Sequence, residues 1–300
     1  MDTGSTGIVV SAEHYIPAAS DTDDGPGRLI YNSSGRILNG QRHTTEVAIL
    51  HDADRPVAIA RVEVLRVTHI TCLEHARECR PERDPRGVAF MGVGFARHAA
   101  QSTEAGPPRN PFVNVTALSS GAPASSVRPG YIIARNGVHL GMTPDLVRDF
   151  AFVKLSPSGA TVAEGPQWSA APMTVSVNGV AGDGTILIDT GINYMFLSPP
   201  AGSGLAHGQR APAGTGIAIA LPDSRHPGAR YGFTVGDSGN PMHPEKVEVV
   251  RDRGVFVNTG RMFLEGFDYL YDAAGGYVGY RWNGHVSHAH GGVTPGLATR

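Results

Sequence analysis

The sequence predicts an all-β protein made of two related lobes. Of its 300 residues, 39 are glycine and 22 are proline, while only 17% are charged. Short runs that contain Val, Ile and Thr alternate with turn residues along the chain, which is typical of β-sheet proteins. In addition, the tripeptide Asp-Thr-Gly occurs once in each half, beginning at Asp2 and at Asp189. Each copy leads into an apolar, β-prone run, so a duplicated lobe with one acidic turn per copy is expected.

The first lobe is expected at residues 1–160. In it, residues 28–31 and 36–38 flank the polar segment Asn-Ser-Ser-Gly at 32–35, whose composition favours a hairpin turn. Apolar residues in the run 57–67 do not alternate strictly, so the sequence leaves the register of this strand undefined. Further strands of this lobe are expected at 46–50, 57–67, 88–95, 131–134, 139–141 and 150–155.

The second lobe is expected at residues 161–283, after a boundary near 155–167. Its strands are expected at 173–177, 185–189, 217–221, 247–250, 255–258, 267–272 and 277–282. Residues 284–300 are rich in Gly, His and Pro and predict a flexible tail. The tail's His285, His288 and His290 could bind a metal, but a solvated tail is favoured and no metal site is expected.

Charge and hydropathy exclude several classes of partner. The chain has 25 basic and 27 acidic residues, so no electrostatic argument supports binding to nucleic acid or to an anionic membrane. No run approaches the roughly 20 apolar residues that a membrane-spanning helix needs. We expect no cofactor, and we expect a monomer that acts on a peptide or protein.

The two cysteines, Cys72 and Cys79, lie close together in the sequence. A disulfide that closes a small loop is favoured if the protein is exported. Two free thiols in a cytosolic protein are the alternative. A Cys/His metal site that includes His69 or His75 is a third interpretation, although the spacing matches no standard zinc pattern.

Several segments, in the same order along the chain, are similar to motifs of the pepsin-like aspartic peptidases. Besides the two Asp-Thr-Gly tripeptides, residues 31–40 resemble the hairpin, called the flap, whose tyrosine closes over the substrate. Residues 90–96 resemble the apolar, Gly-containing strand that passes behind the first aspartate. Residues 258–264, with 269–272 and Gly279, resemble the corresponding C-terminal segment, and Trp168 lies where the family often has an aromatic residue.

This resemblance implies a bilobal fold with a central cleft and an endopeptidase that uses Asp2 and Asp189 as a catalytic pair. It implies that one carboxylate takes a proton from a bound water while the other protonates the peptide carbonyl. The implied supporting residues hold the two loops together, donate to the carboxylates or close over the substrate. They are Thr3, Gly4, Ser5, Tyr31, Thr190 and Gly191.

Departures from the family pattern support other interpretations. In the family, a strand leads into the first aspartate, whereas only Met1 stands before Asp2 in this sequence. This difference predicts a chain truncated at its N-terminus, with Asp2 poorly fixed. Ile192 replaces a residue that usually carries a hydroxyl beside the second aspartate. A non-catalytic peptide- or protein-binding member of the fold, or an inactive fragment, is therefore the alternative. Secretion or a periplasmic location is favoured over the cytoplasm if a signal peptide precedes Met1.

Overall fold

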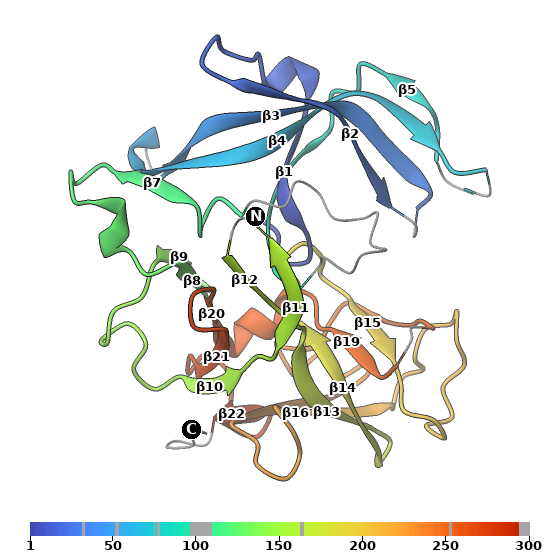
Figure 1. Cartoon of the computed structure of the whole chain (residues 1–300). Helices are drawn as coiled ribbons and strands as arrows, with labels where there is room; N and C mark the ends of the chain where they lie inside the picture. The colour runs from blue at the N-terminus through green and yellow to red at the C-terminus, as the bar shows by residue number, and fades with distance from the viewer. Residues whose placement is uncertain are drawn as a thin grey trace. The chain divides into compact units, whose positions relative to one another are not determined.

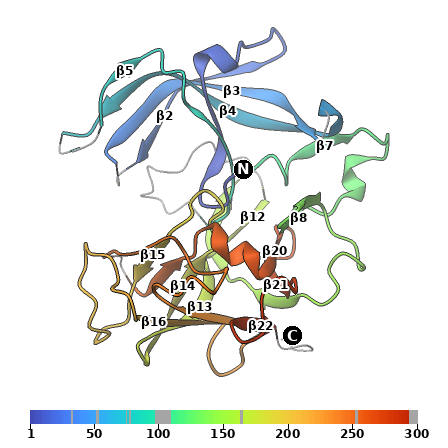
Figure 2. The same ribbon diagram turned by 180° about the vertical axis from the view of Figure 1, so that it is seen from behind.

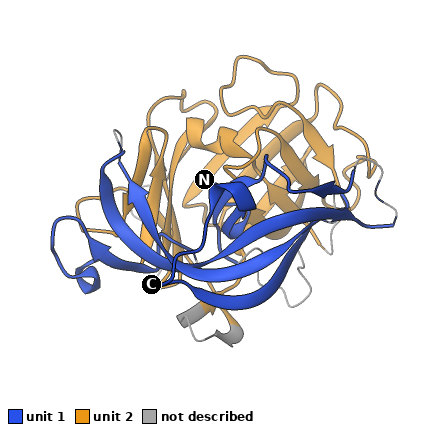
Figure 3. Cartoon of the chain, turned by 90° about the horizontal axis from the view of Figure 1, so that it is seen from above, with its two compact units in different colours: residues 1–127 blue, residues 128–300 orange. Residues whose placement is uncertain are grey.

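The computed structural model describes residues 1–31, 34–51, 54–74, 76, 79–96, 110–162, 165–251 and 254–293. Its regular structure consists of β-strands and a few short 3-10 helices, so the predicted all-β class is confirmed (Figure 1). The chain divides into two compact units, residues 1–127 and residues 128–300 (Figure 3). In the described ranges, no helix is long and apolar enough to cross a membrane.

Unit 1 is built around one twisted sheet in which β2, β3, β4, β1 and β6 are neighbours in this order, and β5 and β7 also pair with β4. The strands are β1 (Thr6–Ser11), β2 (Thr22–Tyr31), β3 (Arg36–Leu50), β4 (Pro56–Cys72), β5 (Glu82–Arg83), β6 (Ala89–Val93) and β7 (Val115–Leu118). Two 3-10 helices, η1 (Ala12–His14) and η3 (Ala124–Ser126), complete the regular elements described in this unit.

The long strand β4 contributes to hydrophobic clusters on both of its faces. Ala60, Val62 and Val64 pack in one cluster, whereas Leu65 and Val67 pack in another. Val64 and Leu65 are thus consecutive buried residues. This change of face explains why the apolar residues of the run 57–67 do not alternate strictly, since side chains of an unbroken strand point alternately to its two faces.

A β-bulge in the same strand pair lies where the register shifts between Asn39 and Gly40 of β3. A Cβ atom on Gly40 would lie 1.9 Å from the carbonyl oxygen of Arg66, so only glycine fits there. Bulges bend the strand that carries them and increase its twist. β3 and β4 are paired on both sides of the bulge, where the sequence predicted separate strands at 36–38 and 46–50.

Unit 2 contains an eight-stranded sheet in the order β18-β15-β19-β14-β13-β16-β17-β22, a five-stranded sheet in the order β10-β21-β20-β8-β9, and the pair β11-β12. The eight-stranded sheet contains β13 (Ala171–Val177), β14 (Val180–Leu187), β15 (Met195–Ser198), β16 (Gly216–Leu221), β17 (Ala229–Thr234), β18 (Val247–Val249), β19 (Phe256–Asn258) and β22 (Gly291–Val293). The five-stranded sheet contains β8 (Gly130–Ala134), β9 (Gly137–Leu140), β10 (Ala151–Lys154), β20 (Phe267–Asp272) and β21 (Tyr277–Trp282). The separate pair consists of β11 (Pro157–Val162) and β12 (Gly165–Trp168).

The core of unit 2 is rich in aromatic residues. The 3-10 helix η4 (Arg261–Glu265), the orange helix in Figure 2, contributes Phe263, which stacks on Phe267 with ring centroids 4.7 Å apart. Tyr231 of β17 meets both rings edge-on. Burial raises the pKa of the Tyr231 phenol well above its usual range, so this hydroxyl stays protonated. The aromatic cluster joins the eight-stranded sheet to the five-stranded sheet within this unit.

The strands at residues 130–154 belong to unit 2, although the sequence placed them in a first lobe that ended near residue 160. They do so because β8 pairs with β20 and β10 pairs with β21, both near the C-terminus. The predicted tail is also partly ordered: β22 pairs with β17, and the His288 ring stacks on Trp282. Residues 294–300 of the predicted tail lie outside the described residues.

Cys72 and Cys79 form a disulfide at the end of β4, as the favoured interpretation of the sequence predicted. Cys79 packs against the cluster that contains Leu65 and Val67. Both thiols are consumed by this bond, which leaves no thiolate for the alternative metal site. His69, one of its two histidine candidates, contacts the Thr68 hydroxyl, and His75 lies outside the described residues.

Candidate functional site

The first acidic loop begins at Asp2 and leads into β1. Its carboxylate accepts two hydrogen bonds from the loop itself: the Gly4 amide donates to Oδ1 and the Ser5 hydroxyl donates to Oδ2, each at 2.6 Å. The Asp2 backbone is held by β6, because its amide donates to the Met91 carbonyl at 2.9 Å and its carbonyl accepts the Val93 amide at 2.8 Å. We expected Asp2 to be poorly fixed so near the start of the sequence, and these hydrogen bonds fix it instead.

Two glycines of the run 90–96 allow β6 to lie directly against this loop. A Cβ atom on Gly92 would lie 2.5 Å from the Thr6 nitrogen, and one on Gly94 would lie 2.3 Å from the Thr3 carbonyl oxygen. The Gly94 amide also donates to the Ser5 carbonyl at 2.8 Å. The close backbone approach that these glycines predicted is therefore present, and it locks the first acidic loop from behind.

Tyr31 is the last residue of β2 and pairs with Arg36 across the hairpin. Its ring lies edge-on to Phe90, with the centroids 6.4 Å apart, and packs against the cluster that contains Leu29. The Gly35 amide donates to the Tyr31 carbonyl at 2.7 Å, which closes the hairpin. Asn32 and Ser33 of the predicted turn lie outside the described residues, and closure of Tyr31 over a substrate stays a prediction.

The second acidic loop follows β14 in unit 2. Asp189 is buried, with 7% of its surface exposed. The Gly191 amide donates to its Oδ1 at 2.8 Å, and the Asn258 side-chain amide donates to its Oδ2 at 2.6 Å. A buried carboxylate needs such donors, because burial without them strongly disfavours the charged form.

The segment after β19 holds this loop from behind, as β6 holds the first loop. The Thr259 amide donates to the Leu187 carbonyl at 3.0 Å, and the Arg261 amide donates to the Ile192 carbonyl at 2.7 Å. Between them, Gly260 has a φ of 65°, and a Cβ atom on it would lie 2.4 Å from the Tyr194 carbonyl oxygen. A glycine at the point of closest approach is thus common to both loops.

The two loops share one local design. In each, the amide two residues after the aspartate donates to Oδ1 and a side chain donates to Oδ2. The hydrogen bonds expected from Gly4, Ser5 and Gly191 are present, and the roles of these residues in catalysis stay predictions. The sequence did not identify Asn258, although it lies in a segment that resembles a family motif. The signal available was Ile192 itself, since a buried carboxylate without a hydroxyl beside it requires a donor from elsewhere.

Asp2 belongs to unit 1 and Asp189 belongs to unit 2, and each is described within its own unit. The pairing of the two carboxylates therefore stays a prediction. The predicted hydrogen bond between Thr3 and Thr190 also joins the two units and stays a prediction. Trp168 lies in unit 2, where its indole Nε1–H donates to the Ala273 carbonyl at 2.8 Å.

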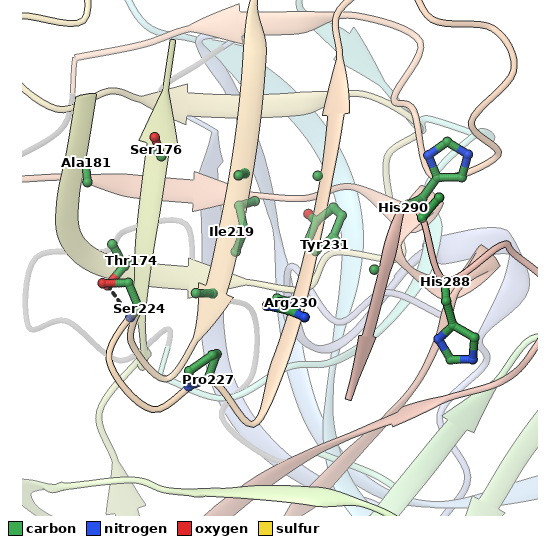
Figure 4. Close-up of a pocket in the computed structure, with 15 residues that line it drawn as sticks. Thr174, Ser176, Ala181, Ile219, Ser224, Pro227, Arg230, Tyr231, His288 and His290 are labelled. Atoms are coloured by element: carbon green, nitrogen blue, oxygen red, sulfur yellow. Dashed lines mark hydrogen bonds between the residues drawn. The ribbon is translucent and has the colours of Figure 1, made fainter. Parts of the chain in front are cut away.

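A separate hollow of about 450 Å³ lies on the eight-stranded sheet of unit 2 (Figure 4). Its lining comes from β13, β14, β16, β17 and the segment before β22, and it includes Thr174, Ser176, Arg230, His288 and His290. None of the described residues that line it belongs to either acidic loop. Among the described residues, no group of three or more His, Cys, Asp or Glu side chains is arranged to hold a metal ion.

No known protein-family model matches this sequence. No curated protein is detectably similar to it either.

Proposed function

We propose that this chain is an aspartic endopeptidase of the pepsin-like kind, with Asp2 and Asp189 as its catalytic pair. The observation that carries the proposal is the shared design of the two acidic loops. Each unit presents one Asp-Thr-Gly loop whose carboxylate oxygens accept one backbone and one side-chain hydrogen bond. Each loop also packs against a Gly-containing segment that lies in, or directly after, a second strand. Hydrogen bonds to a carboxylate also occur at Asp21, so the support comes from their combination with the closely packed Gly-containing segment. This combination holds each carboxylate in the narrow range of geometry that a catalytic group needs.

The chemistry follows from two carboxylates that act on one water. Two such groups at short range cannot both ionise, so the pair holds one proton. The ionised carboxylate takes a proton from the water as the water oxygen bonds to the peptide carbon. The other carboxyl gives its proton to the carbonyl oxygen, which yields a neutral gem-diol. No covalent bond to the protein forms at any step.

The second candidate function is binding of a peptide without cleavage, because one fold can carry unrelated functions. Ile192 is the observation that favours it, since this residue brings no hydroxyl to Asp189. The Asn258 amide weakens this argument, because it donates to the same carboxylate. We therefore place the peptidase first.

The test is cleavage of a quenched fluorescent peptide library from about pH 3 to about pH 7, the range in which a carboxylate pair exchanges one proton. We expect cleavage by the parent protein and its loss, by about a thousandfold or more, in Asp2→Asn and in Asp189→Asn. An amide can neither accept the water proton nor supply a proton to the carbonyl oxygen. Asp145→Asn is the matched control, because the Asp145 side chain is 88% exposed and pairs with Arg148 at the surface.

The binding alternative makes a different prediction in the same assay. A protein that only binds peptides would show saturable binding and no cleavage at any pH. Its two aspartate variants would then be no different from the parent in turnover. Cleavage that survives both Asp2→Asn and Asp189→Asn would exclude the proposed pair as its cause.

A further inference from the structure

The two acidic loops differ at one equivalent position. Ser5 is the third residue after Asp2, and its hydroxyl donates to Asp2 Oδ2 at 2.6 Å. Ile192 is the third residue after Asp189 and has no polar atom in its side chain. Asp189 Oδ2 instead accepts a hydrogen bond of the same length, 2.6 Å, from the Asn258 amide.

Asn258 is presented to Asp189 by the sheet. It ends β19, which lies beside β14 (Figure 1). The two strands are parallel, and Leu187 is opposite Asn258. Its side chain is buried, with 6% of the residue exposed, and its Oδ1 accepts the Gly260 amide at 3.0 Å. Since that oxygen is occupied by a donor, the nitrogen Nδ2 must face the aspartate. Both ends of the Asn258 amide are thereby fixed.

A hydroxyl and an amide nitrogen differ in what they can accept. The Ser5 hydroxyl can donate to an ionised Asp2 and can turn to accept a proton that resides on Asp2 Oδ2. The Asn258 nitrogen can only donate, so a proton on Asp189 Oδ2 would face another hydrogen atom and lose this contact. Asp189 also accepts the Gly191 amide on its other oxygen, and this donor is equally unable to accept. These two donors therefore favour the ionised form of Asp189, whereas the Ser5 hydroxyl can bond to either form of the Asp2 carboxyl.

We propose that Asn258 is a positioning residue that replaces the missing hydroxyl at position 192 and holds Asp189 as the ionised member of the pair. The inference rests on the proposed peptidase function and assigns the two roles within it. Asp189 takes the proton from water, and Asp2 gives its proton to the carbonyl oxygen. When the gem-diol collapses, the proton on Asp189 passes to the leaving nitrogen. Asp2 regains a proton from a gem-diol hydroxyl, so the pair returns to its starting state.

The first experiment compares Asn258→Leu with the double variant Asn258→Leu, Ile192→Thr. We expect Asn258→Leu to lower kcat by about 10- to 100-fold, because it removes a hydrogen bond to the charged carboxylate of Asp189. KM should change little, because Asp189 acts on the water and Asn258 itself does not hold the peptide. The acidic limb of its pH–rate profile should move to higher pH, because Asp189 loses a donor to its ionised form. Ile192→Thr should restore at least about tenfold of the loss, because it brings back a hydroxyl at the position that Ser5 occupies in the first loop.

Unchanged kcat and pH profile in Asn258→Leu would overturn the inference. So would a folded double variant that recovers nothing, because a hydroxyl would then not replace the amide. If Asn258→Leu does not fold, Asn258→Asp replaces it, since an aspartate can still accept the Gly260 amide but, when ionised, cannot donate to Asp189. Ile192→Thr alone is the control for any effect of the threonine itself.

The second experiment needs no cleavage. A double-mutant cycle of thermal unfolding with Asn258→Leu and Asp189→Ala should be non-additive, because each variant removes the same contact. Strictly additive losses would overturn the inference, since Asn258 would then act on something other than Asp189. A parent protein that cleaves no peptide overturns the proposed function and the inference together. A parent that cleaves, with an Asn258→Leu variant of equal kcat, overturns the inference alone.

Discussion

Asp2 and Gly92 form a parallel β-bridge that fixes the first acidic loop to β6. The bridge uses the Asp2 amide and carbonyl, which bond to the residues on either side of Gly92. Gly92 itself makes the close approach possible, because it has no side chain to fill the space in front of Thr6. The position of this aspartate therefore depends on a glycine 90 residues further along the chain.

Gly92→Ala should destabilise unit 1 and displace the loop of Asp2. The new methyl group would lie 2.5 Å from the Thr6 nitrogen, so backbone must move, at a cost of about 2 kcal/mol in the free energy of unfolding. Urea unfolding followed by circular dichroism measures this loss. Gly87→Ala is the matched control, since a Cβ atom there meets nothing within 4 Å, and it should change stability by less than about 0.5 kcal/mol. Equal stability of the two variants would contradict this account of the bridge.

The residue that donates to Asp189 Oδ2 could not be predicted from the sequence. Ile192 indicated that a hydroxyl was missing, but the donor that replaces it comes from Asn258, on another strand. Only the parallel pairing of β14 with β19 brings these residues together. Local residue patterns predict strands and turns well, but they contain little information on which distant strands become neighbours.

The same reason explains the differences in strand assignment. Local composition and spacing were enough to predict the all-β class and the Cys72–Cys79 disulfide. They also predicted the close backbone approach of the Gly-containing strand to the loop of Asp2. By contrast, the placement of residues 130–154 in unit 2 depends on pairing with β20 and β21. The change of face between Val64 and Leu65 likewise follows from two clusters that form on opposite sides of β4. Both are properties of tertiary packing.

Asp21 should make the stability of unit 1 depend on pH. Hydrogen bonds from the Thr45 hydroxyl, the Ala18 amide and the Tyr15 hydroxyl hold the pKa of this carboxyl below its usual range. Burial, together with the bond to Asp21, raises the pKa of Tyr15 to about 12, so its hydroxyl remains a donor. A carboxyl whose pKa is lower in the folded state contributes stability at pH values above its pKa in the unfolded state. This contribution is lost as the pH falls through its pKa in the folded state.

Asp21→Asn should therefore lower the urea midpoint at neutral pH, and its difference from the parent should shrink below about pH 4, where the unfolded carboxyl is protonated. Urea unfolding at several values between about pH 7 and about pH 2.5 measures the difference. Asp145→Asn serves as the control, because its side chain is 88% exposed. A difference that is constant over the whole range would show that the Asp21 carboxylate is not the source.

Reduction of the Cys72–Cys79 disulfide should destabilise the end of β4. The bond closes a short loop, and loss of such a constraint on the unfolded chain costs about 2 kcal/mol. We expect dithiothreitol to lower the unfolding midpoint of the parent. It should have no effect on the double variant Cys72→Ser, Cys79→Ser, which should already resemble the reduced parent. The prediction would be contradicted if the unfolding midpoint of the parent stayed the same after both thiols had been shown to be reduced.

Tyr31 provides the last test, which separates packing from a role toward substrate. Tyr31→Phe keeps the ring that packs edge-on against Phe90, whereas Tyr31→Ala removes it. We expect Tyr31→Ala to lose about 2 kcal/mol of stability, because the ring packs against the cluster of Leu29, and Tyr31→Phe to lose much less.

If Tyr31 closes over bound peptide, Tyr31→Ala should also raise KM and lower kcat/KM by at least about tenfold, because water would enter above the reacting carbonyl. Phe90→Ala is the control, since it removes the same ring contact from the other side and leaves the tyrosine in place. Should Phe90→Ala and Tyr31→Ala lower kcat/KM equally, the activity loss reflects packing of the hairpin, and Tyr31 has no separate role toward the peptide. A loss confined to Tyr31→Ala supports its closure over the substrate.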